Sequence, residues 1–554
     1  MKKTYIFLTI IFCFILFAGF NILTAATSPK SQKAVSDGLQ RVIMAIETRG
    51  NTLGNVTFKI ANAGNNAGDG QGARTHGGCI WPVNSGRAYI YGQGLGFAAK
   101  KRVGDKVNKL TTLSYNPNNG YSNHVPGRIE EGDSYSWDPV LREKYQVYIS
   151  TEFDKTTGQS KDTTVTVQKW PIWKVADGQT DKFGVYNLIT EERDLANYPK
   201  GPAMVADEQL HTVFKDTEIA KYLGDRDEMK RLGYPMRLQY EESVFYWNTE
   251  QYKDIVIIYY KVINMSTDTL NDCYLAPLSD NDIIDSVATD TAQVSNDIAK
   301  YYSTDTTLNL GYTWTNTDKG EAGKHFGYVG ISLLMTPAVK QDGFLRSDKN
   351  IYQPDEQLGL KTFELFPIES DTIVLGDLYG YITSGKKAAS ILPSDIRLLY
   401  STGPFNMLPG DTAKLFVMLN FATPSKGGEA DGTDEDVVGL VNQVKLGRSF
   451  FYDEILTKIV EQETINKGNF SINSVYPNPA VSNVNIDFNK LISGYTNVEI
   501  INLMGQKIFS GNYYISDNGT NSLTLNIETI AQGAYVLKIT NKGQISTKMF
   551  SILR

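Results

Sequence analysis

Short apolar stretches recur along this chain, and clusters of Gly, Asn and Asp separate them. Most of the stretches alternate apolar and polar residues, which is the period of a β-strand with one buried face. The stretch at residues 254–264 (DIVIIYYKVIN) is almost continuously apolar, so it predicts a central strand of a sandwich. Further strands are expected at residues 55–62, 87–97, 145–150, 163–170, 326–335, 371–383 and 413–422.

The order of these patterns indicates the fold class. Strand-like stretches follow one another without the regular intervening helices that a doubly wound α/β fold needs. The high content of Tyr and Gly, at 32 and 48 residues, suits strands joined by many turns. We therefore predict an all-β chain whose body is a multi-domain β-sandwich.

Changes in pattern divide the 554 residues into parts. After the N-terminal region, residues 27–54 are expected to be helical or extended, residues 55–250 to be a first β-rich part, and residues 251–425 to be a β-sandwich with an acidic loop. Residues 426–473 are predicted to be a short helical connector followed by a linker. Residues 474–554 suit a small Ig-like β-sandwich. The apolar stripe of the connector helix comprises Val437, Val441, Val444, Ile455 and Ile459.

The N-terminus has the pattern of a secretory signal peptide. Lys2 and Lys3 precede an apolar run at residues 5–20, and small residues follow it. We expect cleavage after Ala26, so that the signal peptide comprises residues 1–26. The alternative is a membrane anchor, but the run is short for a spanning helix and no other long apolar run occurs in the sequence. The pattern therefore does not favour an integral membrane protein.

The charge of the chain bears on its partners. The formal net charge of −7 becomes −9 once Lys2 and Lys3 leave with the signal peptide. A strongly acidic protein is repelled by nucleic acid and by anionic membrane surfaces, so neither is expected as a partner.

The end of the chain resembles a known family. A Tyr-Pro-Asn-Pro opening is followed by a hydrophobic strand that ends at a Gly turn, then by a Gly-Ala-Tyr strand and a final strand with a Lys. These features are similar to the type A C-terminal sorting domain of the type IX secretion system. The residues that carry the resemblance are Tyr476, Pro477, Asn478, Pro479, Gly505, Gly533, Tyr535 and Lys548.

This resemblance implies a route and partners. It implies export across the outer membrane of a Bacteroidota-like bacterium and recognition by the type IX secretion machinery. In many such cargoes the domain is cleaved and the protein is attached to surface polysaccharide. Residues 50–425 also resemble large, uncharacterised surface proteins that carry the same sorting domain, and this second resemblance implies no activity.

The densest acidic stretch, at residues 278–297, suggests a metal site. Carboxylate and carbonyl oxygens in a loop are the ligands that Ca²⁺ requires. The spacing does not match an EF-hand, because no Gly stands at the sixth position of the loop. A structural Ca²⁺ site and a solvated acidic loop therefore both fit the sequence, and no other cofactor is expected. The candidate ligands are Asp280, Asp282, Asp285, Asp290 and Asp297.

Two cysteines remain after the signal peptide. Cys79 and Cys273 could form one disulfide in an oxidising compartment, or they could be two buried thiols.

No catalytic pattern stands out in the sequence. The four histidines match no zinc-ligand spacing, and no Gly-x-Ser-x-Gly elbow occurs. We therefore expect a non-enzymatic structural or adhesive protein, which binds surface polysaccharide or assembles with itself. A secreted hydrolase is the less favoured alternative.

Sugar chemistry gives two further hypotheses. Trp170 and Trp173 could stack on a glycan, although tryptophans more often pack in a core. Asp followed by Ser or Thr resembles the O-glycosylation signal of secreted Bacteroidota proteins, although such pairs also start turns. This pattern begins at Asp162, Asp268, Asp285, Asp290, Asp305, Asp371 and Asp411.

Overall fold

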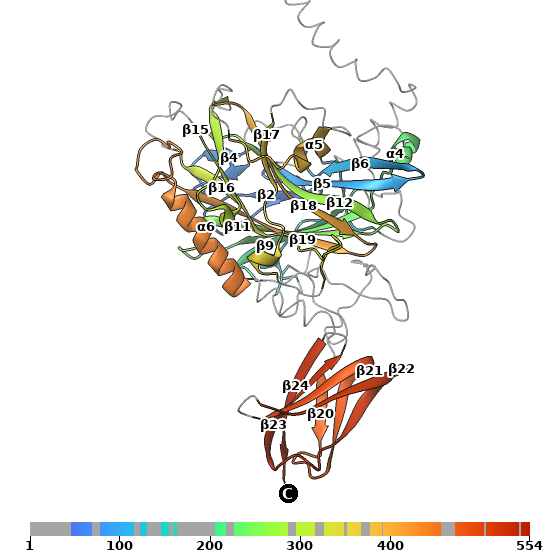
Figure 1. Cartoon of the computed structure of the whole chain (residues 1–554). Coiled ribbons are helices and arrows are strands. Elements are labelled where there is room, and N and C mark those ends of the chain that lie inside the picture. The colour runs from blue at the N-terminus through green and yellow to red at the C-terminus, as the bar shows by residue number, and fades with distance from the viewer. Residues whose placement is uncertain are drawn as a thin grey trace, which may run out of the picture. The chain divides into compact units, whose positions relative to one another are not determined.

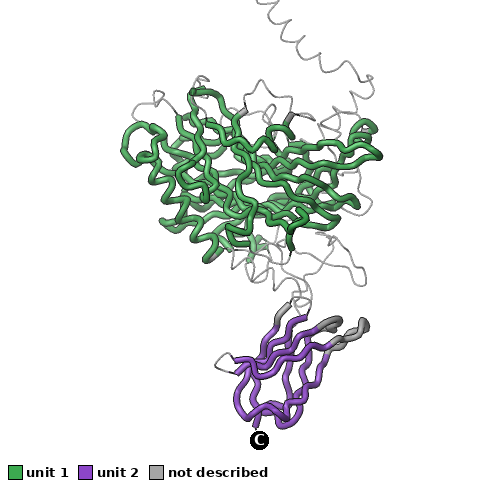
Figure 2. Tube along the Cα trace, viewed as in Figure 1, with its two compact units in different colours: residues 1–193, 200–460 green, residues 194–199, 461–554 purple. Residues whose placement is uncertain are grey.

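The structure is a computed structural model, and its chain divides into two compact units (Figure 2). The larger unit, here called the body, comprises residues 1–193 and 200–460. The smaller unit, here called the tail, comprises residues 194–199 and 461–554. The structure describes residues 46–68, 78–115, 122–129, 146–154, 160–162, 205–217, 226–285, 295–315, 326–347, 352–366, 377–389, 392–455, 471–502, 506–541 and 544–553.

The largest element of the body is an antiparallel sheet of nine strands (Figure 1). Its order begins at the edge with β14 and passes through β11 near the middle. The strands in order are β14 (Asp297–Tyr301), β15 (Leu310–Thr315), β16 (Tyr328–Met335), β19 (Thr412–Ala422), β11 (Ile255–Asn264), β10 (Leu238–Tyr246), β9 (Glu208–Lys215) and β7 (Val125–Pro126), with β8 (Tyr148–Ile149) beside β9.

A second antiparallel sheet of five strands packs on one face of the first. Its strands in order are β17 (Thr362–Phe366), β18 (Ile396–Met407), β12 (Leu270–Asn281), β5 (Gly92–Val103) and β6 (Lys106–Leu113). The main core lies between the two sheets, where Val256 and Ile258 of β11 meet Phe97 of β5 and Leu275 of β12. This face-to-face arrangement confirms the predicted all-β sandwich body.

The other face of the nine-stranded sheet is covered as well. Helix α6 (Val438–Phe450) lies along it (Figure 1), and a π-helical turn (Phe451–Ile455) continues the helix. Leu440 and Val444 of the helix pack with Ile257 and Tyr259 of β11 in a second core. Strand β11 is therefore buried on both faces, which is why residues 254–264 are continuously apolar.

The expected connector helix is thus a layer of the body. The prediction treated residues 426–473 as a link between domains, but the described part of this segment up to Ile455 belongs to the larger unit. The apolar stripe was identified correctly at Val441, Val444 and Ile455, which are all buried in the second core. The helix belongs to the body because its apolar stripe packs on the face of the nine-stranded sheet that the five-stranded sheet leaves uncovered.

One predicted strand is partly helical. The sequence predicts a strand at residues 371–383, whereas Asp377–Thr383 forms helix α5 beside β18 and β5 (Figure 1). Leu378, Tyr379 and Ile382 share one face of this short helix and cover the outer side of the five-stranded sheet. The spacing of these three residues fits a helical turn as well as a strand, so periodicity alone does not decide between them.

The remaining described elements of the body are short. Two small sheets pair β1 (Thr48–Gly50) with β2 (Lys59–Ala61), and β13 (Ile284–Asp285) with β4 (Arg87–Ile90) and β3 (Cys79–Ile80). The remaining helices are α4 (Arg226–Leu232) and the 3-10 turns η3 (Ser150–Glu152), η5 (Thr306–Leu308) and η6 (Pro354–Glu356). The predicted strand at residues 163–170 lies outside the described residues, as do the signal peptide and most of residues 27–54.

The expected boundary between residues 250 and 251 does not separate two compact units. Strand β10 before it pairs with β11 after it, from Leu238 opposite Asn264 to Tyr246 opposite Val256. Strand β5 likewise pairs with β12 in the second sheet. Because both sheets contain strands from both halves, residues 55–193 and 200–425 belong to one unit.

The tail has its own sheet and its own core. Its described strands are β20 (Ile472–Tyr476), β21 (Asn483–Asn502), β23 (Gly533–Asn541) and β24 (Gln544–Ile552) in that order, with β22 (Lys507–Asn526) beside β21. Ile486, Ile500 and Leu537 are fully buried in its core. An Ig-like sandwich has two separate sheets, whereas these five described strands form one continuously paired sheet.

In the described part of the chain, none of the helices is long and apolar enough to cross a membrane.

Candidate functional site

Three aspartates meet at one end of the five-stranded sheet. Asp280 and Asp282 lie at the end of β12, and Asp395 lies directly before β18. Carboxylate oxygens of these three residues all lie within 4.8 Å of one another. The strand register explains the meeting, because Asp280 pairs with Arg397 and Asn281 with Ile396 in the antiparallel ladder. One step further, this register places Asp282 opposite Asp395.

A fourth aspartate, from the other sheet, lies beside this group but is not part of it. Asp297, the first residue of β14, is fully buried. Its Oδ2 accepts a hydrogen bond from the backbone N–H of Ile283 at 3.1 Å, and its carbonyl accepts one from Ser394 at 3.0 Å. Among the described residues, its Oδ1 has no hydrogen-bond partner. Burial raises the pKa of Asp297 well above its usual value, and the negative charges of Asp282, Asp395 and Asp280 raise it further.

Asp280 has a neutral neighbour and a cationic neighbour. The hydroxyl of Tyr115 donates a hydrogen bond to Oδ2 of Asp280 at 2.6 Å. Nε of Arg397 lies 3.7 Å from the same oxygen, and both side chains of this ion pair are almost fully buried. Asp280 is thus held in place by neutral and cationic neighbours, while Asp282, Asp297 and Asp395 add three further carboxylates.

The structure separates the predicted ligands. Asp280 and Asp282 come together, as the acidic stretch suggested, whereas Asp297 lies outside the three-carboxylate group and is hydrogen-bonded to the backbone N–H of Ile283. Asp285 lies on β13 opposite Arg87 and is not a member of the three-carboxylate group. Asp290 lies outside the described residues. Asp395 was missed, because nothing in its local sequence links it to residues 278–297 and only the register of β12 and β18 brings it there.

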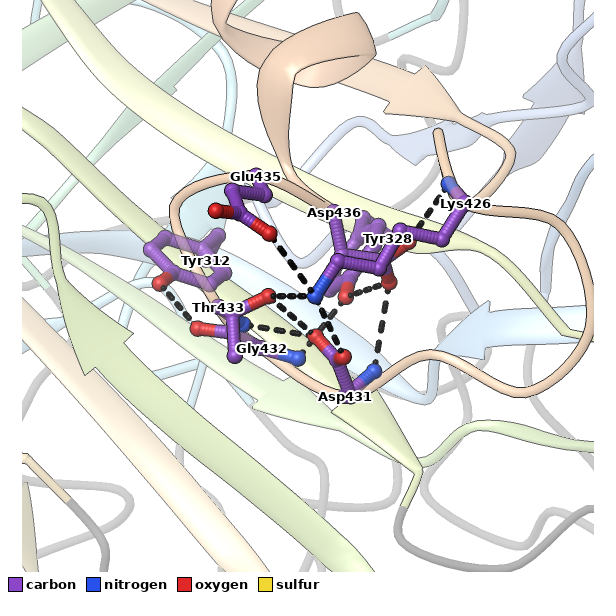
Figure 3. Close-up of polar contacts among 8 residues, drawn as sticks. All are labelled: Tyr312, Tyr328, Lys426, Asp431, Gly432, Thr433, Glu435 and Asp436. Atoms are coloured by element: carbon purple, nitrogen blue, oxygen red, sulfur yellow. Dashed lines mark hydrogen bonds and ion pairs between the residues drawn. The ribbon is translucent and has the colours of Figure 1, made fainter.

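A second acidic segment follows β19 and is shown in Figure 3. The carboxylate of Asp436 is fully buried and accepts hydrogen bonds from the hydroxyl of Tyr328 at 2.6 Å and from the backbone N–H groups of Lys426 at 2.9 Å and Asp431 at 3.2 Å. The ammonium group of Lys426 lies 3.0 Å from Asp431 and 3.5 Å from Glu435. The carboxylates of Asp431, Glu435 and Asp436 all contact groups within this segment or on β16. These contacts fix the position of the chain just before α6 begins.

Hydrogen bonds within this segment stabilise the charged form of one of its carboxyl groups. Hydrogen bonds from the side chain and backbone of Thr433, together with Lys426, lower the pKa of Asp431 to about 2. Gly432 adopts a left-handed φ of 68°, and a Cβ there would meet the ring of Trp314 at 2.2 Å. The segment therefore closes tightly over the second core at a position where glycine is required.

The two cysteines do not form the disulfide that was one of the predicted alternatives. Cys79 on β3 and Cys273 on β12 are free and fully buried. Burial raises the pKa of both thiols, which disfavours the reactive thiolate. The two residues therefore contribute as small core side chains.

The histidines in the described residues lie in the interior. Burial lowers the pKa of His124 to about 3, and its ring packs against both Phe214 and Tyr240. Nδ1 of His211 lies 2.9 Å from Oγ of Ser243, and both residues are buried between strands β9 and β10. Their burial gives these groups a packing role in the described body.

The tryptophans of the predicted glycan platform, Trp170 and Trp173, lie outside the described residues. Trp81, Trp247 and Trp314 are described, and all three are buried in the cores of the body. These three residues follow the usual preference of tryptophan for core packing.

The motif residues of the tail connect its first and last strands. Oδ1 of Asn478 accepts hydrogen bonds from the backbone N–H of Ser551 at 2.9 Å and from its hydroxyl at 2.8 Å. The ammonium group of Lys548 donates to the carbonyl of Asn473 at 2.7 Å. The opening turn is therefore fixed to β24, although the two segments are at opposite ends of the tail sequence.

The Gly-Ala-Tyr strand anchors the tail core. The hydroxyl of Tyr535 donates to the carbonyl of Ala531 at 2.8 Å, and its ring packs near Phe550 with centroids 6.1 Å apart. Gly533 has a φ of 156° and permits the start of β23. Tyr476, by contrast, is about half exposed and its hydroxyl lies 3.3 Å from Asp487. Gly505 lies outside the described residues.

Comparison with protein families now identifies the tail. The family described as "Secretion system C-terminal sorting domain" matches residues 474–552. The chain carries a type IX sorting domain. A type IX sorting domain implies interaction with the type IX secretion machinery and export to the cell surface or release from the cell. The match is confined to the tail and assigns nothing to the body.

The other comparisons add no activity. No curated protein matches this chain. Similar solved structures include CopC from Methylosinus trichosporium OB3b, with 16% identity, 15% of this chain and 90% of CopC covered, and a TM-score of 0.13. A polysaccharide lyase is 9% identical over 92% of this chain and 46% of the lyase, with a TM-score of 0.22. The BSP domain of a biofilm-associated protein is 9% identical over 92% of this chain and 81% of that domain, with a TM-score of 0.15.

These scores are too low to support a shared fold. The chain also spans less than half of the polysaccharide lyase. The sorting domain is therefore the finding on which a functional proposal can be built.

Proposed function

We propose that this protein is a non-enzymatic structural or adhesive protein of the bacterial surface. It enters the periplasm by the signal peptide at residues 1–26 and crosses the outer membrane by the type IX route. The observation that carries the proposal is the sorting domain at residues 474–552. Attachment to surface polysaccharide, or assembly with other copies, then displays the body outside the cell.

The construction of the body supports a structural role. Both faces of the nine-stranded sheet are packed, one by the five-stranded sheet and one by α6. The histidines that the structure describes, His124 and His211, are buried in this packing. Such a layered sandwich gives a stiff module that is suited to carrying load or presenting a surface.

The export claim is tested by deleting residues 474–554 in the native host and fractionating the cells. We expect the full chain at the outer surface or in the medium, and the truncated chain in the periplasm. A matched control is Asn497→Ala, which changes an exposed side-chain contact of the tail outside the motif and leaves export intact. Continued release of the truncated chain would contradict the proposed route.

The role of the body is tested separately. Beads coated with the purified body are expected to retain cells or to cluster with one another, and a panel of glycans and hydrolase substrates is included in the same experiment. Turnover of any substrate contradicts the non-enzymatic role. Binding to a defined glycan without clustering favours the glycan-binding alternative.

A further inference from the structure

We propose that one end of the body sandwich binds a hard divalent cation of the Ca²⁺ type, and that this ion ties the two sheets together. The proposal does not depend on the exported function. The ligands are the converging carboxylates of Asp280, Asp282 and Asp395, and Asp297, which lies beside this group, turns its Oδ1 toward the same ion when the ion binds.

The first support is the spacing of the oxygens. Oxygens of Asp280, Asp282 and Asp395 lie within 4.8 Å of one another. Two oxygens bound to one Ca²⁺ at about 2.4 Å can be separated by no more than roughly 5 Å. The three carboxylates can therefore reach one ion with only small side-chain movements.

The second support is independent of that spacing and comes from Asp297. Its side chain is fully buried, and its Oδ1 has no hydrogen-bond partner among the described residues. Its other oxygen is held by the N–H of Ile283, next to Asp282, and its backbone by Ser394, next to Asp395. Asp297 is thus hydrogen-bonded to the residues that follow Asp282 and precede Asp395 in the sequence. A buried polar atom without a partner is costly, and a cation beside it removes that cost.

The charges point in the same direction. Arg397 and the hydroxyl of Tyr115 both engage Oδ2 of Asp280. Neighbouring buried carboxylates repel one another, and a bound cation relieves this repulsion. Carboxylates are hard oxygen ligands, which select Ca²⁺ over soft transition metals.

The position in the fold gives the ion its role. Asp280, Asp282 and Asp395 belong to the neighbouring strands β12 and β18 of the five-stranded sheet or directly adjoin them, whereas Asp297 begins the edge strand β14 of the nine-stranded sheet. An ion held by all four therefore links the two layers of the sandwich.

The experiment uses the full mature chain, stripped with EDTA and titrated with CaCl₂. We expect one bound Ca²⁺ per chain by calorimetry and a saturable rise of about 5 °C or more in the midpoint of body unfolding. Trp fluorescence follows that unfolding, since described tryptophans lie in the body cores. Binding that is absent up to about 1 mM Ca²⁺ overturns the proposal.

Three variants separate ligation from folding. Asp297→Asn keeps an acceptor for the Ile283 N–H but removes the charge. It is expected to unfold at the same or a higher temperature in EDTA, and to lose at least tenfold in Ca²⁺ affinity. Asp395→Asn repeats the affinity measurement at a side chain that is only half-buried, where a substitution disturbs folding less. Asp285→Asn is the matched control, a buried aspartate outside the group, and it keeps the Ca²⁺ response.

Two results would contradict the assignment. One is wild-type Ca²⁺ affinity in both Asp297→Asn and Asp395→Asn. The other is an equal response to Mg²⁺, because Mg²⁺ demands a stricter octahedral shell than four clustered carboxylates offer.

Discussion

Buried polar side chains cross the main core between the two sheets of the body. The side chain of Asn66 donates hydrogen bonds to Gln93 at 2.7 Å and to Glu242 at 2.6 Å. Gln93 on β5 in turn contacts the hydroxyl of Tyr260 on β11 at 3.2 Å. Burial raises the pKa of Glu242 to about 8, although hydrogen bonds from Asn66 and Tyr260 lower it. An interior carboxyl is thus protonated at neutral pH and links the layers as a neutral group.

Glu242 predicts a pH-dependent stability. Its unfolded pKa is near 4.5, so between about pH 4.5 and 8 the folded state binds more protons than the unfolded state. The free energy of unfolding therefore falls as pH rises through this window, by about 1.4 kcal/mol per unit of pKa difference. Glu242→Gln replaces the titrating carboxyl by a neutral amide, so the variant does not lose this stability as the pH rises. We expect similar stability of the two proteins near about pH 5 and a more stable variant near about pH 9, measured by urea unfolding.

Two comparisons make this test specific. Asp216, whose pKa burial raises to about 6, keeps part of the slope in both proteins. The control Glu250→Gln changes a side chain that is 89% exposed and is expected to leave the curve unchanged. A Glu242→Gln variant that is destabilised equally at every pH would argue against a pH-linked carboxyl.

At the scale of the elements, α6 determines how the body is completed. The segment before it is tied down by the Asp436 carboxylate, which joins Tyr328 of β16 to the backbone at Lys426 (Figure 3). The helix then packs its apolar face on β16 and β19. A sheet with one bare apolar face is unstable in water, so this helix is a structural requirement of the body.

This packing predicts a difference between two positions of the same helix. Leu440 is fully buried in the second core, whereas Val438 is 45% exposed. Leu440→Ala should lower the free energy of unfolding by about 2–5 kcal/mol, because it leaves a cavity. Val438→Ala is the matched control and should change it by less than about 0.5 kcal/mol. Urea unfolding followed by Trp fluorescence measures both, and equal effects would show that α6 is not packed as described.

At the scale of the whole molecule, the chain is built from two units with separate cores. The tail core, with Ile486, Ile500 and Leu537, shares no residue with the described cores of the body. This division suits an exported protein, because a sorting domain with its own core can be recognised or removed without unfolding the body.

The division predicts independent stability. A chain that ends at residue 460 should unfold, by Trp fluorescence, within about 2 °C of the full chain. None of the six tryptophans of the sequence belongs to the tail, so this signal reports the body alone. Hydrogen exchange over residues 471–553 follows the tail in the full chain. A fall of more than about 5 °C in the body midpoint would show that the body depends on the tail for its stability.

Local features of the sequence predicted much of this molecule. The alternating stretches gave the right strand class, and the continuous run at residues 254–264 was correctly read as a central strand, because side-chain period and burial are local properties. The sorting motif was recognisable for the same reason, since Asn478, Gly533 and Tyr535 occupy set positions along the sequence. Helix α5 was misjudged because seven residues are too few for periodicity to decide.

The sequence by itself determined the all-β class and the export signal, since both are written in short runs of neighbouring residues. Only the tertiary structure decided that residues 55–193 and 200–425 form one unit, that α6 covers a sheet, and that Asp395 joins Asp280 and Asp282. Each of these depends on the register between strands that are far apart in the chain. That register is set by the packing of whole sheets rather than by any local pattern.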